Sequence, residues 1–375
     1  MKPDRLHIVT FDVPYPPTYG GAIDVFYRIK ALYQKGIRIT LHCTYKGTLT
    51  HYPELESLCD CVYYYRRSMP MVRGLFSTLP IAVRGRCNDQ ILANLLRDDA
   101  PILYEGLVSC GTMANPRLSA RTKYFRECNV EHDYYRGLAQ AAHSWRKLYY
   151  IIEAHRLQTF ERTLANASVI FTLAHQDELH FREAFPQVPT IYLPCFHSNT
   201  SIVTPRGIGS GILYHGNLDV PENRMALGYI LEHIVPRMPD VPFVVAGRTN
   251  DEWLQKTGSP CSNVRFVPNP KEDEMQRLVQ NAQIHLLLTF QNTGLKLKLL
   301  NVLYRGRYVV CNTFMANGSG LEALCHIADT PESIVRVCRD LLSRPLSESE
   351  IECRREVLAD FDNEQLKNRL YASLR

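Results

Sequence analysis

The sequence lacks several features that would each have pointed to a particular class of protein. No apolar run approaches the roughly 18–20 residues of a membrane-spanning helix, and the first residues lack the long apolar stretch of a signal peptide, so we expect neither. No C-x-x-C or H-E-x-x-H spacing occurs, although the chain has 12 cysteines and 13 histidines. We therefore expect reduced thiols in the cytoplasm and no bound metal.

The loops that commonly bind nucleotides are absent as well. The chain has no G-x-G-x-x-G, the usual dinucleotide fingerprint, and no G-x-x-x-x-G-K-[ST], the phosphate-binding P-loop. Its single D-x-D triplet, Asp360-Phe-Asp362, follows the last expected strand, so we do not expect a metal-held diphosphate there. The net charge of +5 is too small for a nucleic-acid-binding surface but compatible with attraction to phosphates or to an anionic membrane.

What the sequence does contain is a repeated alternation of short apolar segments with amphipathic ones. A strand expected over residues 6–11 is followed by a loop rich in proline and glycine, a helix over 22–35 and a strand over 37–43. This order builds parallel sheets. It restarts at residue 212, after a segment over 189–205 whose composition predicts a linker. The later elements are expected as strands at 212–215, 241–246, 264–267, 284–289 and 308–312, with helices at 224–235, 272–281 and 296–304.

The chain of 375 residues is long enough for two domains that each bury a core. We predict an α/β protein with two tandem Rossmann-like, doubly wound domains facing a cleft, residues 1–200 forming the first and 201–350 the second. Residues 351–375 are expected to form a C-terminal helix, for which a return to the first domain is one option. Ligands of such sheets bind beyond the carboxyl ends of the strands, so we sought candidate residues there.

Three loops at expected strand ends carry glycines where a ligand would approach the backbone. Gly20-Gly21 lies between the first strand and its helix, and Gly216-Asn217 and Gly247-Arg248 follow consecutive strands of the second domain. Glycine leaves space beside the backbone, whereas helix amides and an arginine favour an anion. The alternative is a set of ordinary tight turns with a solvated arginine.

A basic helix start in the second domain is a further candidate for phosphate binding. Lys296 and Lys298 lie in or near the first turn of the helix after an apolar strand, where the helix dipole disfavours cations. A bound diphosphate would explain two lysines at that end better than the commoner alternative, a solvated basic face. Thr293, Gly294 and Asn301 belong to the same loop and helix.

Titratable side chains gather in residues 126–136, after a strand expected at 123–125. His132, or Glu131 beside it, could act as a general base or bind a sugar hydroxyl. Cys128 and His132 are at helical spacing, but two ligands without a third and fourth make a weak metal site. A hydrophilic helix start with a surface histidine is the alternative.

Together these segments resemble the GT-B-fold, nucleotide-sugar-dependent glycosyltransferases of family four, within glycosyltransferase group 1. The resemblance extends over almost the whole chain and depends on the order and spacing of its motifs rather than on any single one. The matching segments are Pro16–Gly21, Tyr214–Leu218, Val244–Arg248, Asn263–Val267, Leu299–Val310 and, with Cys128 in place of the family's histidine, Arg126–Glu131.

The resemblance implies a retaining, metal-independent transfer of a sugar from a UDP- or GDP-linked donor in the second domain to an acceptor in the cleft. No cofactor beyond this co-substrate is implied. The donor diphosphate would lie near Thr293-Gly294 and the donor side would include Gly216, whereas Gly20-Gly21 and Asn129 would line the acceptor side. Implied partners are the donor and a saccharide or lipid-linked acceptor of surface polysaccharide biosynthesis, in the cytoplasm, with peripheral membrane association as one option.

The chain departs from the family pattern at groups that bear on catalysis. The family's Glu-x7-Glu pair is replaced by Thr293 and Asn301, and its Arg and Lys after the first donor strand by Asn217 and, approximately, Asn223. Without a metal, cations must stabilise the charge that grows on the leaving diphosphate. The groups expected to do so are Arg248, Lys296 and Lys298, with the Thr293-Gly294 backbone.

Two other functions remain open alongside transfer. The first is a non-catalytic GT-B partner or sugar-nucleotide-binding protein that has lost the donor-site carboxylates. The second is a GT-B nucleotide-sugar epimerase, which should require a carboxylate-rich cleft. Nucleic acid is not an expected partner, because no basic stripe interleaved with aromatics occurs.

Overall fold

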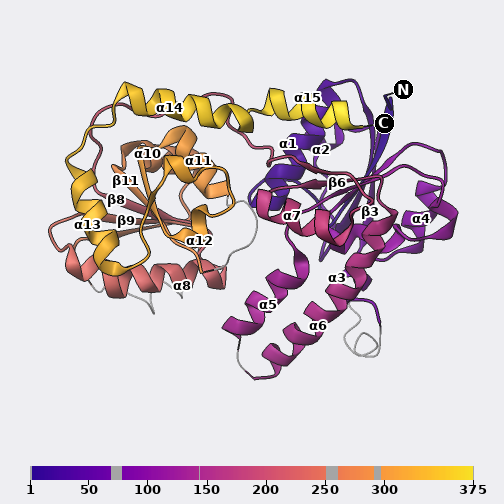
Figure 1. Cartoon of the computed structure of the whole chain (residues 1–375), viewed down its shortest axis with the longest axis horizontal. Coiled ribbons are helices and arrows are strands. Elements are labelled where there is room, and N and C mark those ends of the chain that lie inside the picture. Colours follow the sequence, from indigo (N-terminus) through magenta and orange to yellow (C-terminus); the bar gives the residue numbers. More distant parts are fainter. Residues whose placement is uncertain (1, 69–77, 143, 251–260, 291–296, 375) are drawn as a thin grey trace. The chain divides into compact units, whose positions relative to one another are not determined.

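The computed structural model describes residues 2–68, 78–142, 144–250, 261–290 and 297–374. These residues group into two compact α/β units (Figure 1). The first consists of residues up to Ser198 together with those from Asp360 onward, and the second runs from Asn199 to Ala359. The sequence analysis put the change of domain after residue 200, two residues from where the structure has it.

In the described part of the first unit, seven parallel strands lie in the order β3-β2-β1-β4-β5-β6-β7. The pairing is in register along the sheet, with Val9 of β1 between His42 of β2 and Tyr104 of β4. The strands are β1 (Arg5–Thr10), β2 (Arg38–Tyr45), β3 (Cys61–Arg66), β4 (Ile102–Glu105), β5 (Lys123–Arg126), β6 (Val169–Thr172) and β7 (Thr190–Tyr192). The α-helices are α1 (Gly20–Gln34), α2 (Pro53–Glu56), α3 (Ile81–Arg84), α4 (Asp89–Leu95), α5 (Glu131–Ala141), α6 (Trp145–Glu161), α7 (His175–Ala184) and α15 (Asn363–Ser373).

The described part of the second unit repeats this architecture with six parallel strands in the order β10-β9-β8-β11-β12-β13. Ile212 of β8 pairs with Phe243 of β9 on one side and Ile284 of β11 on the other. The strands are β8 (Ile212–His215), β9 (Phe243–Gly247), β10 (Val264–Pro268), β11 (Ile284–Leu287), β12 (Tyr308–Cys311) and β13 (His326–Ile327). The α-helices are α8 (Pro221–Tyr229), α10 (Glu272–Asn281), α11 (Leu297–Arg305), α12 (Thr313–Ala316), α13 (Pro331–Leu342) and α14 (Glu348–Leu358).

The central strands are buried on both faces because helices cover both sides of each sheet. Every residue of β4, β8 and β11 is buried. In the first unit, α15 completes one of these layers: Leu366 and Leu370 join Ile8 and Leu32 in a single apolar cluster. Figure 1 shows α15 beside α1.

Three expectations about local structure need correction. The segment 189–205 is not only a linker, because it contains β7. The C-terminal segment is two helices rather than one, since Asp362 caps the N-terminus of α15 with its side chain and so interrupts the helical run. The helix expected from residue 224 already begins at Pro221, because proline suits the first helical turn.

Among the described residues, no helix combines the length and apolar character that crossing a bilayer requires.

Candidate functional site

The strand order of the second unit identifies where a ligand would bind. Winding reverses between β8 and β11, which are neighbours in the sheet although far apart in the sequence. Doubly wound sheets bind ligands beyond the carboxyl ends of the strands at this point. The loops after His215 and Leu287 therefore frame the candidate donor site.

The glycines at these strand ends bring two loops into direct contact. Gly247 has a φ of +149°, and a Cβ added there would lie 1.8 Å from the carbonyl oxygen of Gly216. The backbone N–H of Leu218 donates to the carbonyl of Arg248 over 2.7 Å. The missing side chain at Gly247 thus makes room for the neighbouring backbone, where the sequence analysis had expected room for a ligand.

Lys298 extends from the start of α11 to the carboxyl end of β8. Its half-buried ammonium donates a hydrogen bond of 3.2 Å to Oδ1 of Asn223 and lies 5.9 Å from the centre of the Tyr214 ring. The Asn223 amide in turn donates to the carbonyl of Asn217 over 2.9 Å, and the Tyr214 hydroxyl donates to the carbonyl of Asn223 over 2.7 Å. A cation is therefore held beside the loop in which Asn217 and Asn223 stand in place of the family's arginine and lysine.

The histidine that ends β8 is uncharged at neutral pH. Burial, and secondarily the charge of Lys298, lower the pKa of His215 to about 4. The ring centre of His215 lies 6.3 Å from that of His285 in β11, whose pKa burial also lowers. The imidazoles of His215 and His285 are therefore neutral, and His215 adds no second charge beside the Lys298 ammonium.

A carboxylate that the sequence analysis missed stands at the other side of the switch point. Glu222, in the first turn of α8, accepts a hydrogen bond from the hydroxyl of Thr289 just after β11. The side chain of Asn312 fixes the same loop, donating to the Thr289 carbonyl over 2.6 Å and accepting from its N–H over 3.2 Å. The proline–glutamate pair that starts α8 is a helix-start signature that could have revealed Glu222 as a helical residue.

The other predicted donor residues have different surroundings. The Arg248 side chain is 73% exposed and lies 3.9 Å from the Asp219 carboxylate. Asn217 uses its side chain to accept from the Asp219 N–H over 3.0 Å, which closes the turn after β8. Asn301 accepts a hydrogen bond of 2.8 Å from Asn199, whereas Lys298 donates to Asn223. Thr293, Gly294 and Lys296 lie outside the described residues.

In the first unit, the carboxyl ends of three strands surround the Phe11 ring. A Cβ at Gly21 would lie 2.8 Å from Cζ of Phe11, so the glycine pair Gly20-Gly21 allows α1 to begin against this ring. Gly106 follows β4 with a φ of +71°, and a Cβ added there would lie 3.3 Å from Sγ of Cys128 after β5 and 3.5 Å from Cδ1 of Phe11. The predicted acceptor loop is thus a closely packed corner of the sheet.

Two arginines converge on the same corner. Nε of Arg86 donates to the carbonyl oxygen of Phe11 over 2.8 Å, and the Arg67 guanidinium donates to that same oxygen. Arg67 also lies 3.2 Å from the Asp12 carboxylate. Burial, with the charge of Arg67 second, lowers the pKa of Arg86 to about 10. Positive charge is therefore concentrated at the carboxyl end of β1.

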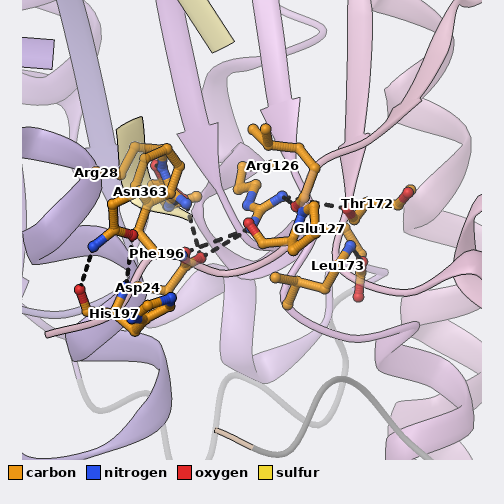
Figure 2. Close-up of polar contacts among 12 residues, drawn as sticks. Asp24, Arg28, Arg126, Glu127, Thr172, Leu173, Phe196, His197 and Asn363 are labelled. Carbon is orange, nitrogen blue, oxygen red and sulfur yellow. Dashed lines mark hydrogen bonds and ion pairs between the residues drawn. The ribbon is translucent and has the colours of Figure 1, made fainter. Parts of the chain in front are cut away.

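Beneath this corner lies a network of fully buried charges, which Figure 2 shows with Asp24 between Arg28 and Arg126. Arg28 lies 2.8 Å from Asp24 and donates to Glu105 over 3.0 Å, and Arg126 lies 3.3 Å from Asp24. Burial acts to raise the pKa of Asp24, but Arg126 and Arg28 hold it below the ordinary value. Arg126, the first residue of the motif that resembles the family's, therefore fixes α1 to β5 and does not face a ligand.

The predicted catalytic residues at the start of α5 point in different directions. Burial raises the pKa of Glu131 to about 7, with Arg86 opposing the shift. His132 is buried on another side of the helix, with Nδ1 3.3 Å from Glu161 and Nε2 3.6 Å from Asp133. Consecutive helical residues are rotated by about 100°, which separates the two side chains. Asn129, just before the helix, is half-buried.

His132, Glu161 and His180 form a cluster in which one atom of each side chain lies within 4.8 Å of the others. The three residues come from three helices, and among the described residues this is the group whose geometry could hold a metal ion. Their own contacts account for the cluster. Nε2 of His180 lies 3.0 Å from Glu161, and this hydrogen bond raises the pKa of His180. Burial acts to raise the pKa of Glu161, but the two imidazoles hold it low. The sequence analysis, which had only Cys128 and His132 to consider, could not have found this grouping.

Comparison with solved structures identifies two such units in tandem as the GT-B fold. The chain is similar to sucrose-phosphate synthase from Thermosynechococcus elongatus, with a TM-score of 0.68 and 16% identity over 99% of this chain and 98% of that one. It is also similar to the UDP-forming α,α-trehalose-phosphate synthase from Burkholderia vietnamiensis, with a TM-score of 0.62 and 12% identity over 99% of each chain. These likenesses define the class of fold.

The sequence of the second unit matches the model of a known family. Residues 209–344 match the family described as Glycosyl transferases group 1. The chain is in addition 25% identical, over 339 residues and 84% of each chain, to a Klebsiella pneumoniae protein described as an uncharacterized 44.6 kDa protein in the cps region. The protein thus has the GT-B fold, as the sequence analysis predicted, and its second unit matches the glycosyltransferase group 1 family, which supports a transferase.

Proposed function

We propose that the protein is a retaining, metal-independent glycosyltransferase that moves a sugar from a UDP- or GDP-linked donor to a saccharide or lipid-linked acceptor. The observation that carries the proposal is the Lys298 ammonium beside the carboxyl end of β8. A diphosphate bound at this switch point would meet a fixed cation. Because the Klebsiella relative is described by its cps region, we assign the transfer to surface polysaccharide biosynthesis.

The chemistry follows from where charge develops. As the bond between sugar and diphosphate breaks, positive charge grows on the sugar ring and negative charge on the leaving diphosphate. Lys298 stabilises the diphosphate without a change in its own position, because Asn223 and the Tyr214 ring already orient its ammonium. Glu222, held by Thr289, is the carboxylate available to bind hydroxyl groups of the donor.

We assign the acceptor to the first unit, at the carboxyl ends of β1 and β5. Arg67 and Arg86 supply cationic donors there, and Glu131 has a carboxyl group whose pKa of about 7 suits it to hold or accept a proton near neutral pH. Because His132 pairs with Glu161 at the end of α6, we assign it the structural role of holding α5 against α6. The expected acceptor is therefore hydroxyl-rich and carries an anionic group.

A panel of labelled UDP- and GDP-sugars tests the proposal. We expect release of labelled sugar from one donor, and a higher melting temperature with the matching nucleoside diphosphate, since ligands that bind the native state stabilise it. The second candidate is a sugar-nucleotide-binding protein without turnover, which is favoured by the engagement of Asn301 with Asn199 at the position of the family's second glutamate. A shift in melting temperature with no sugar release or transfer from any donor would support that candidate and refute transfer.

A further inference from the structure

The first two turns of α6 expose large apolar side chains to solvent. Trp145 is 72% exposed, Leu148 60%, Ile151 49% and Ile152 42%. Helices α5 and α6 pack against each other as a hairpin, and Figure 1 shows this hairpin extending away from the sheet of the first unit. Contiguous exposed apolar surface of this kind marks an interaction site.

The periodicity of α6 separates this apolar surface from the core. At about 100° per residue the four exposed side chains lie within an arc of about 120°, opposite the buried face. That buried face consists of Glu153, Ala154, Leu157, Phe160 and Glu161. Further along the helix the outward arc turns polar, with His155, Gln158 and Thr159. The apolar surface is thus confined to the helix start at the end of the hairpin.

Cations accompany the apolar side chains. Arg146 and Lys147 are both exposed, and residues 145–152 contain no acidic side chain. The Arg146 guanidinium lies 5.8 Å from the centre of the Trp145 ring. Tryptophan with neighbouring lysine and arginine is the combination that favours the interface of a bilayer carrying anionic lipids.

We propose that the start of α6, residues 145–152, docks the protein on an anionic bilayer surface, Trp145, Leu148, Ile151 and Ile152 entering the interface and Arg146 and Lys147 contacting lipid phosphates. The inference rests on the proposed function only in that a lipid-linked acceptor would be presented at such a surface. A protein partner or a second copy of this chain would cover the apolar residues equally well, but neither would make the protein prefer anionic lipid.

Flotation of the full chain with vesicles tests the proposal. We expect binding to vesicles of phosphatidylcholine with about one third phosphatidylglycerol, weakening with salt, and much weaker binding to phosphatidylcholine alone. The double variant Leu148→Ser/Ile152→Ser should bind at least about tenfold more weakly, because each apolar side chain contributes to partitioning. Arg146→Gln/Lys147→Gln should remove most of the preference for anionic vesicles.

The chain supplies a matched control. Leu179 of α7 is also 60% exposed in the same unit, so Leu179→Ser should leave vesicle binding unchanged. In a Trp253→Phe background, Trp145 emission should shift to the blue when vesicles are added. Absence of vesicle binding by the wild type, or equal binding by the α6 and α7 variants, would overturn the proposal. So would concentration-dependent dimerisation abolished by the α6 variant. UDP and GDP binding, measured without lipid, reports separately on the donor site.

Discussion

Replacing Lys298 by alanine tests the donor site at the group on which it depends most. The ammonium is half-buried and oriented by a 3.2 Å hydrogen bond to Asn223, so little reorganisation is needed when a phosphate oxygen approaches. A hydrogen bond to a charged group contributes roughly 1.5–3 kcal/mol. At about 1.4 kcal/mol per tenfold change, Lys298→Ala should weaken UDP or GDP binding by about 10- to 150-fold. Turnover should fall at least as far, because the diphosphate gains charge in the transition state.

Isothermal titration of each variant with UDP and GDP measures this change directly. Lys298→Arg should retain a large part of the affinity, since the charge persists. Lys271→Ala, which removes an exposed lysine at the N-cap of α10 in the same unit, should change nothing. The exchange Asn223→Lys/Lys298→Asn should recover part of the binding, because it returns a cation to the same hydrogen-bonded pair. A folded Lys298→Ala protein that binds within about twofold of wild type, some 0.4 kcal/mol, would refute the assignment.

Three further substitutions, with Gly228→Ala as a control, test the packing and the charges. Gly247→Ala should destabilise the second unit by about 3 kcal/mol in urea unfolding, because its Cβ would overlap the Gly216 carbonyl, whereas Gly228→Ala in α8, with open space around it, should be neutral or stabilising by up to about 1 kcal/mol. Asp24→Asn should cost about 3–5 kcal/mol in the same assay, since it leaves two buried arginines short of a counter-charge. Glu131 keeps its proton in the folded state up to about pH 7, so the stability that it contributes is present at low pH and is lost as the pH rises from about 4.5 through 7, by roughly 3 kcal/mol in total. Urea melts at about pH 5 and pH 8 should show this loss for the wild type and not for Glu131→Gln, and equal slopes for the two proteins would contradict the prediction.

The fold followed from the sequence because its signals are local. The strand predicted at 212–215 and the helix predicted at 272–281 coincide with β8 and α10, the first a short apolar run bounded by Gly211 and Gly216 and the second an amphipathic segment of helical period. Strand–helix alternation then required parallel sheets, and the break after residue 200 separated two of them. Even the position of Lys298 at the start of α11 was evident from the apolar positions around it.

The polar partners did not follow, because they depend on contacts between distant segments. The sequence analysis left Pro221 and Glu222 in a loop, so the pairing of Glu222 with Thr289 was beyond its reach. It treated His132 as a surface or catalytic group, since nothing local indicates that Glu161 lies against it. The requirement for glycine at 247 was recognised, but the atom that occupies the space is the carbonyl of a neighbouring loop.

The position of Lys298 also indicates how the proposed donor site would tolerate its departures from the family pattern. Coulomb attraction depends on the distance between charges and on their burial, not on which helix carries the cation. Amides at 217 and 223 take the place of two cations of the family pattern, yet the Asn223 side chain accepts from the Lys298 ammonium and so brings a positive charge to the same loop. The neutral state of His215 is consistent with this arrangement, because a second cation beneath Lys298 would be repelled. Loss of the usual basic residues therefore does not imply loss of diphosphate binding, and the pair Asn223–Lys298 is where affinity for the donor should be sought.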